Sequence, residues 1–182
     1  KPERLGRRAP LEMGLCGNIK DTLQALQPLL KEKQDTQFLD EMVEFYKQVK
    51  KRLETYVDDQ GKAEAISPEF VAATISKLAA QDAIFTVDTG MTNVWTARYL
   101  EATGKRVLLG SFNHGSMANA MPQAIGAALA TPGRQVYALC GDGGLTMLLG
   151  DLMTIIQYKL PVKVIVFNNR SLGMVKLEME VA

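Results

Sequence analysis

The stretch Gly141-Asp142-Gly143-Gly144 decides the fold of this chain. An apolar run over residues 135–140 precedes it, and apolar side chains at helical spacing follow it. A second apolar run, Val162 to Phe167, comes directly after Pro161. This order predicts a strand, a glycine-rich turn, one helix and another strand, which together form a βαβ unit. Helix and strand patterns alternate from Ser67 onward, so we predict an α/β fold with an open, largely parallel sheet flanked by helices.

The glycine-rich turn has the properties of a phosphate site. Glycine lets the backbone approach a ligand closely, and a helix start offers free N–H groups and a positive dipole end. Asp142 adds a carboxylate in this turn, and Asn169 adds an amide oxygen after the next strand. Because parallel neighbours bring their carboxyl ends to one edge of a sheet, these oxygens should lie together, as Mg²⁺ ligands do. The residues predict a site for a diphosphate and a divalent cation.

Two further loops follow predicted strands and belong to the same edge of the sheet. The strand Ala83 to Val87 leads into the loop 88–92, and a strand near Val107 to Leu109 leads into the loop 113–117. Ligands of open α/β sheets bind outside the carboxyl ends of strands, so all three loops could meet at one crevice. Each loop could also be an ordinary turn of the chain.

Two motifs carry a resemblance to a known family. Gly141-Asp142-Gly143 and Asn168-Asn169, with 24 residues between them, resemble the thiamine diphosphate signature of the decarboxylase and oxidase superfamily. The loop from Gly110 to Pro122 resembles the pyrimidine-side loop of the flavin-containing pyruvate oxidases, which include the quinone-dependent pyruvate dehydrogenases. The resemblance extends from about Leu11 to Glu180. It implies an enzyme with thiamine diphosphate, Mg²⁺ and FAD that oxidises pyruvate to acetate and CO₂ and passes electrons to a quinone.

The resemblance also implies roles for individual residues. The expected metal ligands are the side chains of Asp142 and Asn169 and the backbone oxygen of Ser171. The residues expected around the diphosphate are Thr89, Gly90, Met91, Gly143, Gly144 and Met174. Gly115 is expected to face the aminopyrimidine, and Met117 to wedge the cofactor into a bent shape. The activating glutamate is expected on the N-terminal pyrimidine-binding domain of a neighbouring subunit, so the resemblance implies a homo-oligomer that acts on pyruvate or another 2-keto acid.

The N-terminal third divides into two predicted parts. Residues 1–30 are expected to be the C-terminal remnant of the middle, flavin-binding domain, with a short strand over Leu11 to Leu15 and a helix capped by Asn18. Residues 31–66 are expected to hold an amphipathic helix from Gln37 to about Val57 and a linker over residues 58–65.

Residues 67–182 are expected to be the pyrophosphate-binding domain of a chain that is a fragment, C-terminally truncated. Ser67-Pro68-Glu69 has the pattern of a helix start. A helix rich in alanine is predicted from Ala118 to Ala130, with Gly126 allowing close packing.

Net charge, cysteine content and the length of apolar runs limit the kinds of partner and location that we expect. A net charge of +1 gives no reason to expect nucleic acid or an anionic membrane. Cys16 and Cys140 lie far apart, one in each predicted domain, which favours two buried, reduced thiols in a cytoplasmic protein. No run of 18 apolar residues occurs, so a spanning helix is not expected. Peripheral membrane association of the intact protein stays open.

Three alternatives compete with the oxidase hypothesis. Leu172 to Val175 also suits acetolactate synthase, a carboligase. The chain could instead be a non-catalytic module that packs against partner chains. A Rossmann NAD domain is the weaker alternative, because Gly141 to Gly144 lacks the required glycine spacing.

His114, the only histidine, could be an acid–base group or a hydrogen-bonded loop residue.

Overall fold

A computed structural model describes residues 2–58 and 65–181 of the chain. The chain forms two compact units, Lys1–Gln48 and Val49–Ala182, which we describe separately. The predicted linker over residues 58–65 falls mainly on residues 59–64, outside the described residues.

The first unit is small and has no strand among its described residues. Its elements are the 3₁₀ helices η1 (Pro2–Arg4) and η2 (Gln27–Leu29), the helix α1 (Ile19–Leu26) and the start of α2 (Gln37–Asp58). Asn18 caps α1 as predicted, because its Oδ1 accepts the backbone N–H of Lys20 at 2.9 Å. The strand predicted over Leu11 to Leu15 is wrong. Its alternating apolar side chains are exposed, and a strand forms only where a neighbouring strand completes its hydrogen bonds. The burial predicted for Cys16 is also wrong, because no described residue of this unit is buried, whereas Cys140 is buried as predicted.

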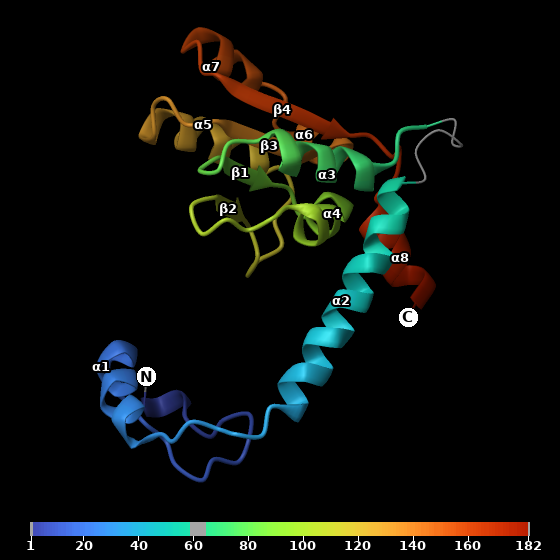
Figure 1. Cartoon of the computed structure of the whole chain (residues 1–182). Coiled ribbons are helices and arrows are strands. Elements are labelled where there is room, and N and C mark those ends of the chain that lie inside the picture. Colours follow the sequence, from blue (N-terminus) through green and yellow to red (C-terminus); the bar gives the residue numbers. More distant parts are fainter. Residues whose placement is uncertain (1, 59–64, 182) are drawn as a thin grey trace. The chain divides into compact units, whose positions relative to one another are not determined.

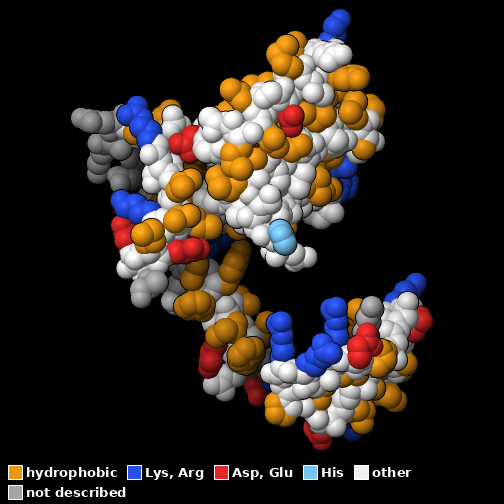
Figure 2. Space-filling model, turned by 180° about the vertical axis from the view of Figure 1, so that it is seen from behind, with side chains coloured by type: hydrophobic (Ala, Val, Ile, Leu, Met, Phe, Trp, Pro, Cys, Tyr) orange, Lys and Arg blue, Asp and Glu red, His pale blue; other side chains and the backbone are white. Residues whose placement is uncertain are grey.

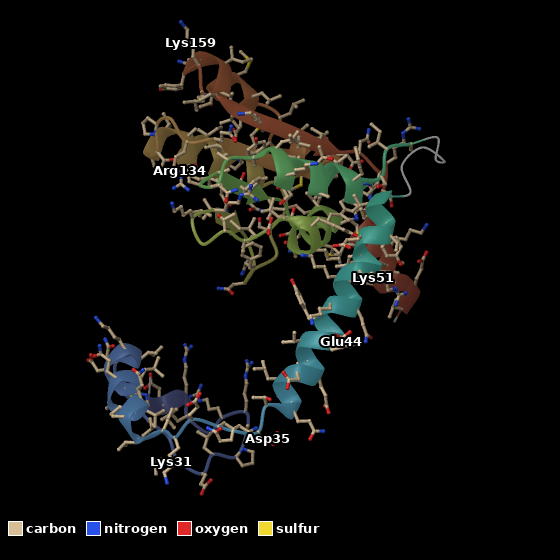
Figure 3. All side chains as sticks on the ribbon, in the orientation of Figure 1. Lys31, Asp35, Glu44, Lys51, Arg134 and Lys159 are labelled. Carbon is tan, nitrogen blue, oxygen red and sulfur yellow. The ribbon has the colours of Figure 1, made fainter. Side chains whose placement is uncertain are left out.

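Helix α2 confirms the amphipathic helix predicted from Gln37. Its Glu44 and Lys51 side chains extend from the helix in Figure 3. Glu44 lies 3.7 Å from Lys47 in an exposed ion pair, and such pairs add little stability. The charged face of α2 is therefore solvated, and apolar side chains such as Phe38 and Tyr46 are exposed as well.

The second unit contains one four-stranded, all-parallel sheet, which confirms the predicted fold class. Its strands are β1 (Ile84–Val87), β2 (Val107–Gly110), β3 (Val136–Gly141) and β4 (Val162–Phe167). Their order is β2-β1-β3-β4, so β1 and β3 are central and almost wholly buried. After β1 the chain forms β2 on one side of β1, and it then forms β3 on the opposite side of β1. The carboxyl ends of β1 and β3 therefore form the switch point at which such sheets bind ligands.

Helices cover both faces of the sheet (Figure 1). Helices α3 (Pro68–Leu78) and α4 (Met91–Tyr99) pack on one face, with Ile75, Phe85 and Tyr137 in the core between them. Helices α5 (Ala120–Ala130), α6 (Asp142–Met147) and α7 (Asp151–Gln157) belong to the other face, with Ala124 and Val136 in its core. Helix α8 (Gly173–Val181) follows β4.

Local signals placed several of these helices correctly. The Ser67 hydroxyl accepts the Phe70 N–H at 3.1 Å, which confirms the predicted start of α3. The single helix predicted between β3 and β4 is wrong, because the chain breaks into α6 and α7. Leu148 leaves the helical region, with φ −127° and ψ 36°, and Gly150 is the N-cap of the next helix. The packing prediction for Gly126 is also wrong, since a Cβ there would meet no atom within 4 Å.

The amino ends of the strands are joined by one arginine. Arg134, which precedes β3 and is labelled in Figure 3, donates from its guanidinium to the Asp82 carbonyl before β1, with an Nε–O distance of 2.8 Å. It also donates to the Lys105 carbonyl before β2 at 3.2 Å. This side chain therefore connects the amino ends of three of the four strands, β1, β2 and β3.

Large apolar side chains remain exposed on the helices. Met153 and Ile156 of α7 are 65% and 66% exposed, and Figure 2 shows apolar side chains interspersed over the visible surface. In the part of the chain that the structure describes, no helix combines the length and apolar character that a membrane crossing requires.

Candidate functional site

A cavity of about 210 Å³ lies at the carboxyl edge of the sheet. The loops after all four strands contribute to its wall, which places it at the switch point between β1 and β3. The wall includes every residue that the sequence nominated for a cofactor or metal: Thr89, Gly90, Met91, Gly115, Met117, Asp142, Gly143, Gly144, Asn169, Ser171 and Met174. The structure thus brings together residues that lie up to 85 positions apart, from Thr89 to Met174.

The carboxylate of Asp142 stands where β3 turns into α6. Its Oδ1 accepts the N–H of Gly143 at 3.0 Å, and its Oδ2 accepts the N–H of Arg170 at 3.0 Å. The second bond connects this turn to the loop after β4, the neighbouring strand. The sequence therefore placed Asp142 correctly at the junction of two parallel strands.

The loop after β4 is stabilised by its own asparagines. Asn168 Oδ1 accepts the N–H of Arg170 at 3.1 Å, and Asn169 Oδ1 accepts the N–H of Ser171 at 3.1 Å. Arg170 adopts φ 54°, a left-handed conformation that such a tight loop requires. The Asn169 amide oxygen keeps a free lone pair, as does each Asp142 oxygen, so both residues retain capacity for a cation.

The donor set fits Mg²⁺ only as part of a larger coordination shell. Carboxylate, amide and backbone oxygens are the ligands that Mg²⁺ takes, but it needs six of them. In the described part of the chain no three His, Cys, Asp or Glu side chains are grouped so that they could hold a metal ion. Asp142, Asn169 and the Ser171 backbone oxygen supply at most three ligands, so the remaining ligands have to be water or ligand oxygens.

The charged side chains in the wall also indicate that an anionic ligand would need a cation. The carboxylates of Asp88, Asp142 and Glu178 line the cavity, whereas no basic side chain is found among the described lining residues. An anion such as a diphosphate would therefore meet only like charges unless backbone N–H groups and a bound cation neutralise it. Among its described residues the wall thus offers an anion backbone N–H groups but no cationic side chain.

The loop after β1 is open to a ligand at its glycine. Gly90 has φ 148°, which L side chains rarely adopt, and no side chain caps α4, which it precedes. The N–H groups of the first turn of α4 are thus partly free. A Cβ on Gly115, which has φ 70°, would lie 3.9 Å from the Thr89 side chain, so the loops after β1 and β2 are neighbours.

Met117 lies over the glycine turn. Its terminal methyl carbon would stand 3.3 Å from a Cβ on Gly143, and its side chain is half-buried. Ala118, the next residue, is buried and has φ 61°, an uncommon conformation for a residue with a Cβ. The wedge role of Met117 stays a prediction.

His114 is exposed and does not line the cavity, so the structure gives no support to an acid–base role there.

Sequence reasoning missed the part played by Asp88. This carboxylate is 2% exposed and accepts backbone N–H groups from Ala120 and Gly141 at 2.9 and 3.2 Å. Burial raises the pKa of Asp88 above its ordinary value of 3.8, while hydrogen bonds from Ala120, Gly141 and Asn119 oppose that rise. An acidic residue directly after a wholly buried strand was the signal in the sequence.

Glu178 and Trp95 are among the other lining residues that sequence reasoning missed. Glu178 lies four positions after Met174 on α8, so helical spacing could have indicated it. Trp95 of α4 lines the cavity and stacks on Phe167 at the end of β4, with ring centroids 5.4 Å apart. No local pattern pairs these two aromatic residues, since their contact depends on the assembled sheet.

Comparison with protein families matches residues 88–182 to the thiamine pyrophosphate enzyme family, C-terminal TPP binding domain. The match covers 95 of 182 residues, slightly more than half of the chain. It begins at Asp88 and includes the whole wall of the cavity.

Individual relatives carry different names. The chain is 34% identical over 180 residues to YdaP of Bacillus subtilis (strain 168), whose name mentions thiamine pyrophosphate; the match covers 99% of this chain and 31% of YdaP. It is 33% identical over 180 residues to pyruvate oxidase of Lactiplantibacillus plantarum, covering 98% of this chain and 29% of that protein. It is 31% identical over 176 residues to the acetolactate synthase large subunit of Corynebacterium glutamicum, covering 96% and 28%. The chain thus spans about three tenths of each relative's length.

Proposed function

This chain belongs to the thiamine pyrophosphate enzymes and contains their C-terminal cofactor-binding domain, and we propose that its cavity binds the diphosphate end of thiamine diphosphate together with Mg²⁺. The observation that supports a bound Mg²⁺ is the negative charge of the cavity wall. Three carboxylates and no described basic side chain surround the cavity, so the diphosphate requires a cation to bind there.

Each wall residue that the sequence nominated has a part in this proposal. Asp142, Asn169 and the Ser171 backbone oxygen would hold Mg²⁺, and the backbone N–H groups of Gly143, Gly144 and Met174 would donate to the diphosphate. The Gly143 N–H donates to Asp142 Oδ1 at 3.0 Å and would exchange this acceptor for the ligand. Thr89, Gly90 and Met91 would surround the same group, because their loop forms the adjoining wall. Gly115 and Met117 would orient the aminopyrimidine, since Met117 lies directly over the glycine turn.

The cofactor supplies the electron sink for cleaving a bond beside a keto group, and the protein binds, orients and shields it. The cavity, at about 210 Å³, is smaller than the roughly 300–1,000 Å³ of most complete ligand sites. This supports a site completed by a partner, for which we propose the N-terminal pyrimidine-binding domain of a neighbouring subunit in a homo-oligomer.

For the full-length protein we propose flavin-dependent oxidative decarboxylation of pyruvate to acetate and CO₂, with electrons passed through FAD to a quinone. The resemblance of the loop Gly110 to Pro122 supports it, as does the likeness to pyruvate oxidase of Lactiplantibacillus plantarum. The matches to acetolactate synthase, at similar identity, support the second candidate, in which two keto acids are joined. Incubating the full-length protein with pyruvate and quantifying acetate against acetolactate distinguishes them.

The metal and diphosphate proposal is tested by three alanine variants of the full-length protein. Asp142→Ala should abolish Mg²⁺-dependent binding of thiamine diphosphate in calorimetry, since it removes the charged metal ligand. Asn169→Ala should weaken binding less, because a neutral ligand is lost. Asn168→Ala is the control for disruption of the loop, because it removes a bond to Arg170 but no side chain of the cavity wall, so it should weaken binding less than Asp142→Ala. Unchanged affinity in Asp142→Ala, or an equal loss in Asn168→Ala, would contradict the assignment.

A further inference from the structure

The carboxylate of Asp88 has no direct contact in the proposed scheme, yet it is one of the most deeply buried polar groups of the chain. It follows β1 and is 2% exposed. Burying a carboxylate costs free energy unless hydrogen bonds satisfy it, and it adds negative charge to a wall that receives an anion. Because Asp88 costs free energy in both ways, we expect its carboxylate to have a role other than packing.

Both oxygens of Asp88 accept N–H groups from other loops of the cavity wall. Oδ1 accepts from Ala120 at 2.9 Å, at the start of α5 and just after the loop that carries Met117. Oδ2 accepts from Gly141 at 3.2 Å, where β3 turns into α6. A single side chain therefore joins the end of β1, the end of β3 and the start of α5.

Two neighbouring features are adapted to this carboxylate. Asn119 occupies the N-cap of α5 but makes no capping hydrogen bond, and Asp88 accepts the N–H of the first helical residue, Ala120, which has no acceptor within the helix. A Cβ at Gly144 would overlap Asp88 Oδ2 and stand 2.8 Å from its Cγ. Glycine at position 144 thus leaves room for the carboxylate as well as for a ligand.

We infer that Asp88 is a positioning residue of the cofactor site, which fixes the Met117 loop relative to the turn of Gly143 and Gly144. The inference rests on the proposed function. Without the carboxylate, the loop and the turn would lose their common anchor and would occupy several arrangements. A ligand that needs one arrangement then binds with an affinity reduced by the fraction of molecules that have it.

Thr86 provides a matched control on the same strand. It is 0% exposed, and its hydroxyl donates to the carbonyl of Ala120 at 2.6 Å and of Tyr137 at 3.3 Å. Thr86 therefore connects β1 to the same residue of α5, but it neither lines the cavity nor contacts the β3–α6 turn. Thr86→Val and Asp88→Asn both remove buried hydrogen bonds, and only the second releases the turn.

The experiment is a calorimetric titration of the full-length protein with thiamine diphosphate in saturating Mg²⁺, together with the melting temperature of each cofactor-free variant. In Asp88→Asn the Kd should rise about tenfold or more, the scale of one lost hydrogen bond to a charged group. In Thr86→Val the melting temperature should fall while the Kd stays at the wild-type value. Stability and affinity are thereby separated.

Three results would decide against the inference. A wild-type Kd in Asp88→Asn overturns it, and so does an equal loss of affinity in both variants. If Asp88→Asn does not fold, hydrogen exchange of the wild type replaces it: cofactor should slow exchange of the Ala120 and Gly141 peptides together, and protection of Gly141 alone overturns the inference. A wild-type protein that binds no cofactor would instead refute the proposed function.

Discussion

Replacing Gly144 by alanine should be far more destabilising than the same change at Gly143, although both residues lie in the same helical turn. At position 144 the new Cβ would overlap Asp88 Oδ2 and lie 3.3 Å from the Ala118 backbone nitrogen. Moving that carboxylate breaks its bonds to Ala120 and Gly141. Hydrogen bonds to charged groups contribute about 1.5–3 kcal/mol each, and replacing glycine within a helix returns about 1 kcal/mol. The expected net loss is therefore about 2–5 kcal/mol.

At position 143 the new Cβ would meet the terminal methyl of Met117 at 3.3 Å and Leu172 at 3.7 Å. A flexible side-chain end can move by a few tenths of an ångström, so the new contact should cost little. This cost and the gain in helix propensity should nearly cancel, and Gly143→Ala should change the free energy of unfolding by less than about 1 kcal/mol. Thermal unfolding of the cofactor-free protein measures both, and the Gly144→Ala melting temperature should fall by roughly 5–15 °C. Equal melting temperatures for the two variants would refute the account of Gly144.

Three further predictions address other parts of the chain. Met117→Ala should lower turnover more than cofactor affinity in steady-state kinetics; unchanged turnover with a stability loss of about 2–5 kcal/mol would make Met117 a core residue only. Burial, aided by the charge of Asp88, raises the pKa of the Cys140 thiol to about 12, so at pH 8 iodoacetamide should label exposed Cys16 and spare Cys140 in the native protein, as peptide mass spectrometry can verify. Arg106→Ala should cost about 2–4 kcal/mol in urea unfolding, because the guanidinium donates to the carbonyls that end α3, two of them at 2.8 Å; a loss equal to that of Arg106→Lys would argue against this geometry.

The sequence was informative where local chemistry decides structure. Ser67 and Asn18 cap helices through their own neighbours, so each could be assigned from a few residues. Asp142 and Asn169 could be paired because the apolar runs before them predicted adjacent parallel strands, and adjacency fixes which strand ends meet. Spacing was thus sufficient to place Asp142 and Asn169 at one edge of the sheet.

Contacts between distant segments were beyond such reasoning. Asp88 acquires its partners only when β1, β3 and α5 are assembled, and nothing near it in the sequence names Ala120 or Gly141. The strand predicted over Leu11 to Leu15 failed for the complementary reason: its pattern was correct, but a strand depends on a neighbour that the local pattern does not specify. The break after α6 likewise follows from the backbone at Leu148, in a run whose apolar spacing continues through it.

The stacked pair of Trp95 and Phe167 has a consequence for spectroscopy. Trp95 is the single tryptophan of this sequence, and it stands in the wall of the cavity rather than on a remote surface. Indole emission depends on local polarity and on nearby quenchers, so the light emitted by this domain originates beside the ligand site. The domain therefore contains a built-in optical probe, whose emission reports what enters the cavity without an attached dye.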